Sequence, residues 1–399
     1  MKTINSHVLK KKKILLRVDL NVPVVNGLIT DRSRIESIKS TIKKLKDGQN
    51  KIFLISHYGR PKGKINKKLS LEFLRPILCE EFDIKKIFFL KSIDNNLIKK
   101  MQHEMALGDI CLMENIRFYK NEEENNIDFS KNLSELFDVY VNDAFSASHR
   151  KHASIVGIPN FLPSFAGDNL LYEINNLNIF LDKPMKPNTS IIGGSKISTK
   201  IEILNNLVEN FNNIIIGGAM ANTFLLAEGI EIGKSVVEKE MLTIAKKIKD
   251  KAKNFNCKII LPIDVVCANN LKDISNIRRC NVKNILPNQM ILDLGEETLK
   301  LIISILLKSN SILWNGPLGA FEYKPFDYST IEIANFFKKK LKNIHVKTLV
   351  GGGDTISAIK MAKAENSFTY TSNAGGAFLE WLAGKESPGI QALKLNNLN

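Results

Sequence analysis

Short apolar runs alternate with amphipathic stretches along almost the whole chain, and this alternation constrains the fold more than any other feature of the sequence. Strands that alternate with helices form parallel sheets covered by helices. The sequence therefore predicts an α/β protein with two doubly wound parallel-sheet domains. Five runs in the first half have the character of buried strands: Ile14–Val18, Ile52–Ile55, Ile87–Leu90, Ile110–Met113 and Val139–Val141. The pattern restarts in the second half with Ser190–Ile192, Ile214–Ile216, Lys258–Leu261, Ile312–Trp314 and Lys347–Val350.

The segment between the two series separates the predicted domains. Within Phe165–Pro187, the stretch Leu170–Leu181 has a helical pattern, which Pro184 and Pro187 then end. A length of 399 residues also fits two domains of ordinary size. We therefore expect Rossmann-like domains at residues 1–169 and 188–384, a helical linker at 170–187 and a tail at 385–399.

The chain carries a large positive charge, because 57 lysines and arginines exceed 41 aspartates and glutamates by 16. A basic nucleic-acid binder is therefore one alternative. Such a protein needs a continuous basic face with aromatic stacking positions. Here the lysines are scattered and aromatic residues make up only 8%. We expect most lysines to form a solvated surface, and we expect no specific nucleic-acid partner.

The nine arginines are more informative, because a guanidinium group is a planar fork that suits carboxylate or phosphate. Their concentration in the first half indicates a small-anion site there. Arg32 and Arg75 are expected to serve surface pairing and packing instead. The seven arginines of the first 150 residues are Arg17, Arg32, Arg34, Arg60, Arg75, Arg117 and Arg150.

The cysteines and the apolar segments indicate in which cellular compartment the protein is expected. The five cysteines are odd in number and never spaced C-x-x-C, which argues against a disulfide framework and a structural zinc site. Lys10–Lys13 is followed by only three apolar residues before Arg17, too few for a signal peptide. The uncharged stretch Ile214–Ala227 contains Asn222 and Thr223 and is too short to span a bilayer. We therefore expect a cytoplasmic protein with no membrane partner.

Polar side chains follow four predicted strands of the first half. Ligands of open α/β sheets collect at the carboxyl ends of strands, so these side chains indicate a compact anion site in which Asp19 and Asn21 hold a hydroxyl group. For His149 and His152, phosphate contact or packing is favoured over zinc, because no third His or Cys is close in sequence. The residues delivered to this edge are Asp19, Asn21, His57, Arg60, Arg117 and Arg150.

Glycine-rich segments follow predicted strands of the second half at Gly193–Lys196, Gly217–Ala219 and Gly351–Thr355. Glycine lets the backbone approach a ligand, and a helix N-terminus offers free N–H groups to phosphate. Within the last segment, Asp354 and Thr355 carry the oxygen ligands that Mg²⁺ prefers. Gly229–Ser235 has three residues between its first glycines where a P-loop has four, and we interpret it as a turn. The second half therefore looks like a nucleotide site without the standard P-loop.

Together, these segments resemble the phosphoglycerate kinase family over essentially the full length of the chain. The matching segments also follow the order and spacing of that family. They are Arg17–Pro23 (RVDLNVP), Ser56–Pro61 (SHYGRP), Glu114–Phe118 (ENIRF), Asn142–Phe145 (NDAF), Gly193–Lys200 (GGSKISTK), Trp314–Pro317 (WNGP) and Gly351–Thr355 (GGGDT).

The resemblance implies reversible, glycolytic transfer of a phosphoryl group from 1,3-bisphosphoglycerate to ADP, which gives 3-phosphoglycerate and ATP and uses Mg²⁺. It implies that Asp19 and Asn21 bind the hydroxyl and carboxylate end of the glycerate, and that Arg34 reaches the phosphoryl group in flight. It also implies a monomer with hinge closure at the linker and a tail that returns to the first domain. The residues implied to hold the non-transferred phosphate are His57, Arg60, Arg117 and Arg150.

On the nucleotide side, the resemblance implies that Asp354 holds the metal and Glu322 binds the ribose. Lys196 would serve both nucleotide binding and catalysis, while Gly375 and Gly376 bring helix amides to the transferring phosphate. The other nucleotide-binding residues that it implies are Gly194, Lys200, Gly218, Asn315, Gly352, Gly353 and Thr355.

The chemistry suits these residue types. In the ATP-consuming direction the acceptor is a carboxylate, whose ordinary pKa of about 3.3–3.7 leaves it deprotonated at pH 7. No general base is needed, so the task is to align donor and acceptor in line and to neutralise the equatorial oxygens.

Two further alternatives stay open at this point. One is an acyl-phosphate kinase with a different carboxylate substrate, although a site for a second phosphate argues against acetate-like molecules. The other is a catalytically weakened homologue that only binds, because the family's S-T-G-G-G-A is Ser372–Ala377 (SNAGGA) here. Ala219 replaces a third glycine, and Ser146–Ser148 replaces a usual G-T-A. The Cβ of Ala374 is harmless only where the backbone φ is negative.

Overall fold

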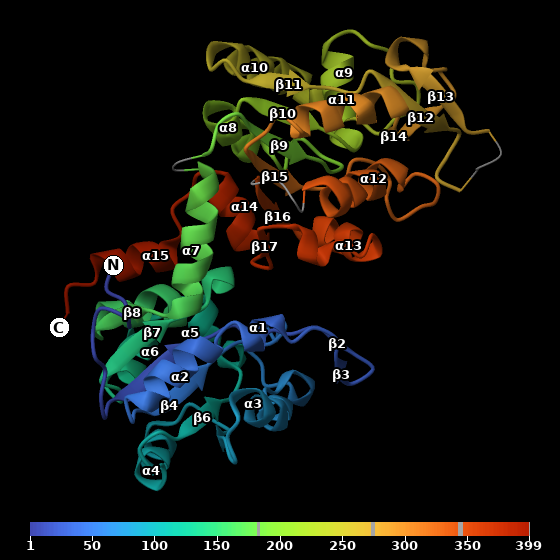
Figure 1. Ribbon diagram of the computed structural model, residues 1–399. Helices are drawn as coiled ribbons and strands as arrows, with labels where there is room; N and C mark the ends of the chain where they lie inside the picture. The colour runs from blue at the N-terminus through green and yellow to red at the C-terminus, as the bar shows by residue number, and fades with distance from the viewer. Residues whose placement is uncertain (182–183, 273–275, 342–345, 399) are drawn as a thin grey trace. The chain divides into compact units, whose positions relative to one another are not determined.

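The computed structural model describes residues 1–181, 184–272, 276–341 and 346–398, and it divides into two compact units (Figure 1). Unit 1 comprises Met1–Asn175 and Glu386–Asn399, and unit 2 comprises Asn176–Lys385. The chain passes from the first unit to the second within helix α7 (Asp168–Leu181). In the described part of the chain, no helix combines the length and apolarity needed to cross a membrane.

The main sheet of unit 1 contains six parallel strands in the order β5-β6-β4-β1-β7-β8. Ile14–Arg17 of β1 and Ile52–Ile55 of β4 are buried without alternation. Strands of this kind have both faces covered, which is why their sequences are continuous apolar runs. The strands are β1 (Lys13–Arg17), β4 (Lys51–Ile55), β5 (Phe88–Leu90), β6 (Ile110–Met113), β7 (Val139–Asn142) and β8 (Ser164–Ala166).

Local sequence sets the ends of several helices in unit 1. Helix α4 begins after Asp94, whose carboxylate accepts hydrogen bonds from the N–H groups of Asn96 and Leu97 at 2.9 and 3.0 Å. Helix α3 ends at Asp83, which adopts the left-handed conformation that stops a helix. The helices are α1 (Ser33–Glu36), α2 (Lys39–Asp47), α3 (Arg75–Phe82), α4 (Asn95–Glu104), α5 (Lys120–Glu123), α6 (Ile127–Ser134) and α15 (Pro388–Leu395).

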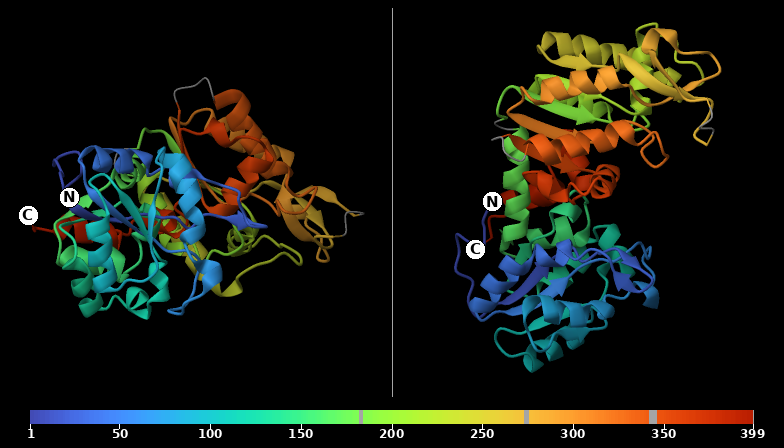
Figure 2. Two further views of the ribbon diagram at one scale, coloured as in Figure 1. Left: turned by 90° about the horizontal axis from the view of Figure 1, so that it is seen from below. Right: turned by 45° about the vertical axis from the view of Figure 1, so that its right-hand side comes forward.

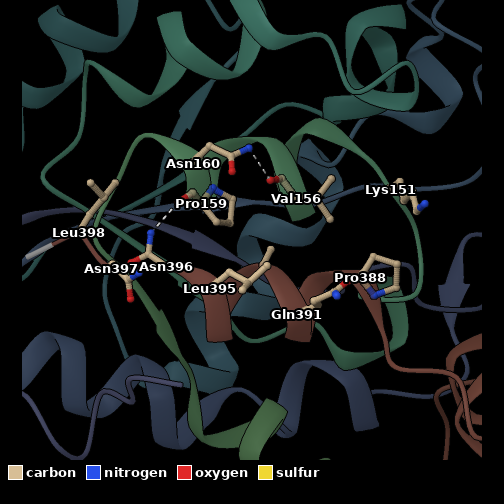
Figure 3. A pocket seen from close by; sticks show the side chains of 11 residues that line it. Lys151, Val156, Pro159, Asn160, Pro388, Gln391, Leu395, Asn396, Asn397 and Leu398 are labelled. Atoms are coloured by element: carbon tan, nitrogen blue, oxygen red, sulfur yellow. Dashed lines mark hydrogen bonds between the residues drawn. The ribbon is translucent and has the colours of Figure 1, made fainter.

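The C-terminal helix α15 packs within unit 1, near β8 (Figure 1). Just beyond it, the Asn396 side chain donates hydrogen bonds to the carbonyl oxygens of Pro159 and Leu162 and accepts one from the Ser164 N–H at 3.1 Å. A pocket of about 480 Å³ lies beside α15 (Figure 3). Its lining includes none of the site residues predicted from the sequence.

The main sheet of unit 2 contains six parallel strands in the order β11-β10-β9-β15-β16-β17. In chain order this is 3-2-1-4-5-6, the order of doubly wound dinucleotide-binding folds, with a topological switch point between β9 and β15. The strands are β9 (Asn188–Ile192), β10 (Asn213–Ile216), β11 (Lys258–Ile260), β15 (Ser311–Asn315), β16 (Lys347–Gly351) and β17 (Tyr370–Ser372).

Helices flank both faces of this sheet (Figure 2). Helix α10 contacts α8 and α9, and α8 also contacts α14, while α12 contacts α11 and α13. The prediction of two doubly wound parallel-sheet domains is confirmed. The helices are α8 (Ile201–Asn210), α9 (Ala219–Ala227), α10 (Leu242–Asn254), α11 (Glu296–Leu306), α12 (Tyr328–Phe336), α13 (Gly353–Met361) and α14 (Gly376–Leu382).

Several strands were not predicted. The edge strands β8 and β17 have three residues each, and the hairpin of β2 (Val24–Val25) and β3 (Leu28–Ile29) is shorter still. Unit 2 also contains an antiparallel sheet in the order β13-β12-β14. Its strands are β12 (Asp264–Ala268), β13 (Arg278–Asn281) and β14 (Met290–Leu294).

Asp143 connects strand β7 to the start of helix α7. Its Oδ1 accepts a hydrogen bond from the Leu170 N–H at 3.0 Å, whereas its Oδ2 is buried without a hydrogen-bond partner in the described residues. Burial raises the pKa of the Asp143 carboxyl to about 7, although hydrogen bonds from Thr41, Leu170 and Asn169 act to lower it. The folded protein therefore retains this proton far above the ordinary carboxyl pKa.

The raised pKa predicts that Asp143 makes unit 1 less stable as the pH rises. Between the ordinary value of 3.8 and about 7, the unfolded chain loses this proton while the folded chain keeps it. The folded state then binds more protons, so this contribution to stability declines through that window and is absent above it. Asp143→Asn mimics the protonated carboxyl, and its melting temperature relative to wild type should rise between about pH 5 and pH 8.

The measurement is thermal unfolding followed by circular dichroism across that pH range. The matched control is Asp47→Asn, which changes an exposed aspartate at the end of α2. If the difference in melting temperature between Asp143→Asn and wild type does not vary with pH, the carboxyl has the same pKa in the folded and unfolded states, which would contradict this prediction.

Candidate functional site

The carboxyl ends of neighbouring strands form the candidate site of unit 1. Arg17 at the end of β1 pairs in register with Ile55 of β4 on one side and Asn142 of β7 on the other. The segments that leave these strands therefore start side by side. The Asn21 Oδ1 accepts a hydrogen bond from the Gly59 N–H at 2.9 Å, which joins two of these segments.

Asp19 is the anionic centre of this edge. Arg34, from α1, donates a hydrogen bond to its Oδ2 at 2.6 Å, and the Ser146 hydroxyl donates to the same oxygen. Burial acts to raise the pKa of Asp19. At the low pH where Asp19 titrates, the charge of His57 and that of Arg34 hold this pKa well below its ordinary value, and hydrogen bonds from Ser146 and the Asn21 N–H lower it further. Asp19 is therefore a carboxylate at neutral pH.

Arg117 brings a buried cation with free donors to the same edge. Its side chain is 2% exposed, and its Nη1 donates to the Gly59 carbonyl at 2.9 Å. Its Nε and Nη2 have no hydrogen-bond partner in the described residues, and Nε lies 3.5 Å from the Glu123 carboxylate. Burial lowers the pKa of Arg117 to about 10, as do the positive charges of Arg150 and Arg17. Crowded cations with unused donors favour an anion.

His57 lies among these cations and is neutral at neutral pH. Burial lowers its pKa well below the ordinary value, and Arg17, Arg117 and Arg150 lower it further, while Asp19 acts in the opposite sense. Arg60, in the segment that follows His57, has an exposed side chain. The structure therefore brings Asp19, His57, Arg117 and Arg150 close enough to influence one another's charge.

The other histidines of this region differ in surroundings. Burial lowers the pKa of His149 to about 4, with Arg150 adding to the effect, and the His149 Nδ1 is buried without a partner in the described residues. The His152 Nδ1 lies 3.7 Å from the buried Glu122 carboxylate. Within the ranges that the structure describes, no group of three or more His, Cys, Asp and Glu side chains is placed to hold a metal ion.

Two arginines expected to serve packing and pairing do so. Arg32 donates to the Glu80 carboxylate at 3.1 Å, and the Arg75 Nε and Nη2 donate to the Ile87 carbonyl at 3.1 and 3.0 Å. The sequence predicted no role for Ser146 at the site, yet its hydroxyl contacts Asp19. Its position four residues before Arg150 was the available signal.

In unit 2, the segments after β9, β10, β15 and β16 lie close together at the switch point. Gly218 and Gly352 have φ values of 66° and 96°, which suit glycine, and they directly precede helices α9 and α13. A Cβ at Gly218 would lie 2.6 Å from the Gly194 carbonyl oxygen, and one at Gly352 would lie 2.5 Å from the Asn315 Nδ2. A side chain at Gly218 would therefore collide with the Gly194 backbone, and one at Gly352 with the Asn315 side chain.

Lys200 is a half-buried cation at this edge. Its Nζ donates a hydrogen bond to the Asn315 Oδ1, and the Asn315 Nδ2 donates to the Gly351 carbonyl at 2.8 Å. Burial lowers the pKa of Lys200 to about 8, while the nearby negative charge of Asp354 acts to raise it. Thr355 is buried, and its hydroxyl accepts from the Gly316 N–H at 2.7 Å.

A cavity of about 300 Å³ adjoins these segments and has the mixed lining of a ligand pocket. Its walls include apolar side chains such as Val236, Leu292 and Leu318. Its polar lining includes Glu322 and Asp354, both with exposed side chains. The lining also includes Gly194 and Gly218 from the sequence prediction.

The remaining predicted residues lie on loops and helix starts. Lys196 is exposed in the loop after β9, and Gly353 starts α13. After β17, Gly375 has a φ of 55° and Gly376 starts α14. The non-glycine residues with positive φ include neither Ala374 nor Ala219. The Cβ atoms at these two departures from the family pattern therefore cause no left-handed strain.

Comparison with known proteins gives one answer. The family model described as phosphoglycerate kinase matches residues 4–385. The phosphoglycerate kinase of Chelativorans sp. is 42% identical over 96% of both chains, and that of Bartonella bacilliformis is 42% identical over 98% of both.

Solved structures agree with this match. The phosphoglycerate kinase of Coxiella burnetii has a TM-score of 0.89 and 35% identity, and it covers 98% of both chains. That of Pyrococcus horikoshii has a TM-score of 0.80 and 27% identity over 99% of both chains. The chain belongs to the phosphoglycerate kinase family.

Proposed function

We propose that this chain reversibly transfers a phosphoryl group from 1,3-bisphosphoglycerate to ADP, giving 3-phosphoglycerate and ATP, as a cytoplasmic, monomeric enzyme of glycolysis. Family membership supports the reaction class. The observation that carries the proposal is the buried Arg117 guanidinium, whose Nε and Nη2 lack hydrogen-bond partners in the described residues beside other cations. Such donors suit the non-transferred phosphate of this substrate.

In unit 1, the substrate is bound by groups of opposite charge at its two ends. His57, Arg60, Arg117 and Arg150 hold the non-transferred phosphate. The ionised Asp19 accepts a hydrogen bond from the glycerate hydroxyl, since a carboxylate has more acceptor sites than the donors it already meets. Asn21 lies beside it and completes the glycerate contacts.

In unit 2, the nucleotide lies along the glycine-rich strand ends and the 300 Å³ cavity. The cavity's apolar wall suits the base, and Glu322 at its lining suits the ribose hydroxyls. Helix N-termini and lysines supply positive charge for the phosphates. The residues proposed to bind the nucleotide are Gly194, Lys196, Lys200, Gly218, Asn315, Glu322, Gly352, Gly353, Asp354 and Thr355.

Asp354 would hold Mg²⁺. Its exposed carboxylate, in the first turn of α13, is a hard oxygen ligand beside the proposed phosphate positions. Mg²⁺ is commonly held by one or two carboxylates together with substrate phosphates, so a single protein ligand fits this ion. When bound, the ion neutralises charge on the nucleotide phosphates.

The transfer itself needs orientation and charge rather than a base. The acceptor carboxylate is already deprotonated at neutral pH. Arg34 and Lys196 carry positive charge to the equatorial oxygens, and the amides at Gly375 and Gly376 add donors at the start of α14. With these roles, the phosphoryl group would pass directly and in line between the nucleotide and the carboxylate of the glycerate.

The function is tested by ATP- and Mg²⁺-dependent phosphorylation of 3-phosphoglycerate, coupled to NADH oxidation through glyceraldehyde-3-phosphate dehydrogenase. Turnover that needs all three components supports the proposal. Binding of both substrates without turnover would favour the weakened homologue. Failure to bind either substrate would contradict the proposal.

Arg34→Ala should lower kcat about 10²–10³-fold, because it removes a donor aimed at charge that develops in the transition state. The KM for ATP should change far less. Arg32→Ala is the matched control, since Arg32 lies two residues away and pairs with Glu80 instead. An unchanged kcat in Arg34→Ala would remove Arg34 from the chemistry.

Arg117→Ala should raise the KM for 3-phosphoglycerate about 10–100-fold, the size expected for lost hydrogen bonds to a charged group. The KM for ATP should stay near its wild-type value, because Arg117 belongs to unit 1. Lys120→Ala removes an exposed cation nearby and serves as the control for charge alone. Equal effects of the two variants would argue against phosphate binding at Arg117.

The proposed sites belong to different units, whereas transfer requires reacting atoms about 3–3.5 Å apart. We propose hinge closure through the linker of residues 170–187, which also excludes water from the acyl phosphate. Residues 182–183 of that linker lie outside the described residues. Solution scattering should show a smaller radius of gyration with both substrates than with either alone. No difference among these states would argue against closure.

A further inference from the structure

Arg17 is a buried arginine that the proposed reaction leaves without a role. Its side chain is 1% exposed at the end of β1. Its Nη2 lies 3.1 Å from the His57 Nδ1, its Nε donates to the Ser154 Oγ at 3.0 Å, and its Nη1 donates to the Val18 carbonyl. All three nitrogen atoms of the guanidinium are therefore engaged within the protein, unlike those of Arg117.

Glu122 holds Ser154, the residue that accepts the hydrogen bond from Arg17 Nε. Its carboxylate is fully buried and accepts hydrogen bonds from the Ser154 hydroxyl at 2.6 Å and from the Ser154 N–H at 2.8 Å. Burial acts to raise the pKa of Glu122, but the nearby His152, the charge of Arg17 and hydrogen bonds from Ser154 lower it overall. A carboxylate anchored in this way orients Ser154, which in turn orients Arg17.

The contact between Arg17 and His57 decides which ring nitrogen carries the proton. A guanidinium group has only donors, so the His57 Nδ1 must present its lone pair to Arg17 Nη2. The proton of the neutral ring then sits on Nε2. In the described residues Nε2 forms no hydrogen bond, so its N–H is available to a ligand.

We propose that Arg17, held by Ser154 and Glu122, is a positioning residue that keeps His57 as the neutral Nε2–H tautomer, so that the ring presents a donor to the substrate phosphate. The proposal rests on the proposed function for the identity of that phosphate. The opposite tautomer would turn a lone pair toward phosphate oxygens, which are themselves acceptors. Arg17 thus acts through His57 and does not contact the substrate.

The direct test reads the tautomer by the ring ¹⁵N shifts of histidine-labelled protein without substrate, with His57→Gln used to assign the resonance. Wild type should show a neutral ring protonated at Nε2 at neutral pH. Ser154→Ala and Arg17→Lys should both move the resonance toward a tautomer mixture. A wild-type ring protonated at Nδ1, or at both nitrogens, would overturn the proposal. This readout needs no activity, so its outcome is independent of whether the proposed reaction occurs.

The kinetic test uses Ser154→Ala, which leaves Arg17 in place. It therefore remains available if Arg17→Lys does not fold. Its KM for 3-phosphoglycerate should rise about tenfold, by loss of a well-placed hydrogen bond to a charged group, with kcat nearly unchanged. Ser134→Ala is the matched control, since Ser134 is also buried and its hydroxyl donates to the Ser130 carbonyl within α6. Equal KM values in the two variants, with the His57 tautomer unchanged in Ser154→Ala, would overturn the proposal.

Discussion

Positive charge concentrated at the carboxyl ends of β1, β4, β6 and β7 is the constraint on which the proposed chemistry depends. Arg17, Arg117 and Arg150 lie near enough to one another to lower the pKa of Arg117. Holding like charges in a buried place is unfavourable unless an anion or a carboxylate compensates them. Asp19, Glu122 and Glu123 compensate part of this charge, and Arg117 keeps two donors without a hydrogen-bond partner in the described residues, which suit the proposed phosphate.

The proposed phosphate contacts of unit 2 are of a different kind. Its strand ends carry glycines where neighbouring groups approach closely, and helices α9 and α13 start directly after two of them. Backbone amides at helix starts attract phosphate without buried arginines. In the proposed reaction, unit 1 would use side-chain charge for the small substrate, and unit 2 would use backbone donors with an apolar cavity for the nucleotide. This proposed difference matches the concentration of the arginines in one half of the chain.

Much of this arrangement was predictable because parallel strands buried on both faces have continuous apolar sequences, and because their carboxyl ends share one edge. The edge strands β8 and β17 are too short to show such a pattern. The chain from Glu122 through Ser154 to Arg17 was not predictable, since it joins residues 32 and 137 positions apart by contacts that only packing creates. Whether the Cβ of Ala374 strains the backbone likewise depends on the φ angle there, which no sequence pattern gives.

The central claim is that the unbonded donors of Arg117, beside His57, form the phosphate site of unit 1. A crystal structure of the chain with 3-phosphoglycerate tests it most directly. We expect phosphate oxygens within hydrogen-bond distance of Arg117 Nε or Nη2 and of His57 Nε2, with the glycerate hydroxyl at Asp19. A phosphate bound elsewhere, such as in the pocket beside α15, with Arg117 still unbonded, would contradict it.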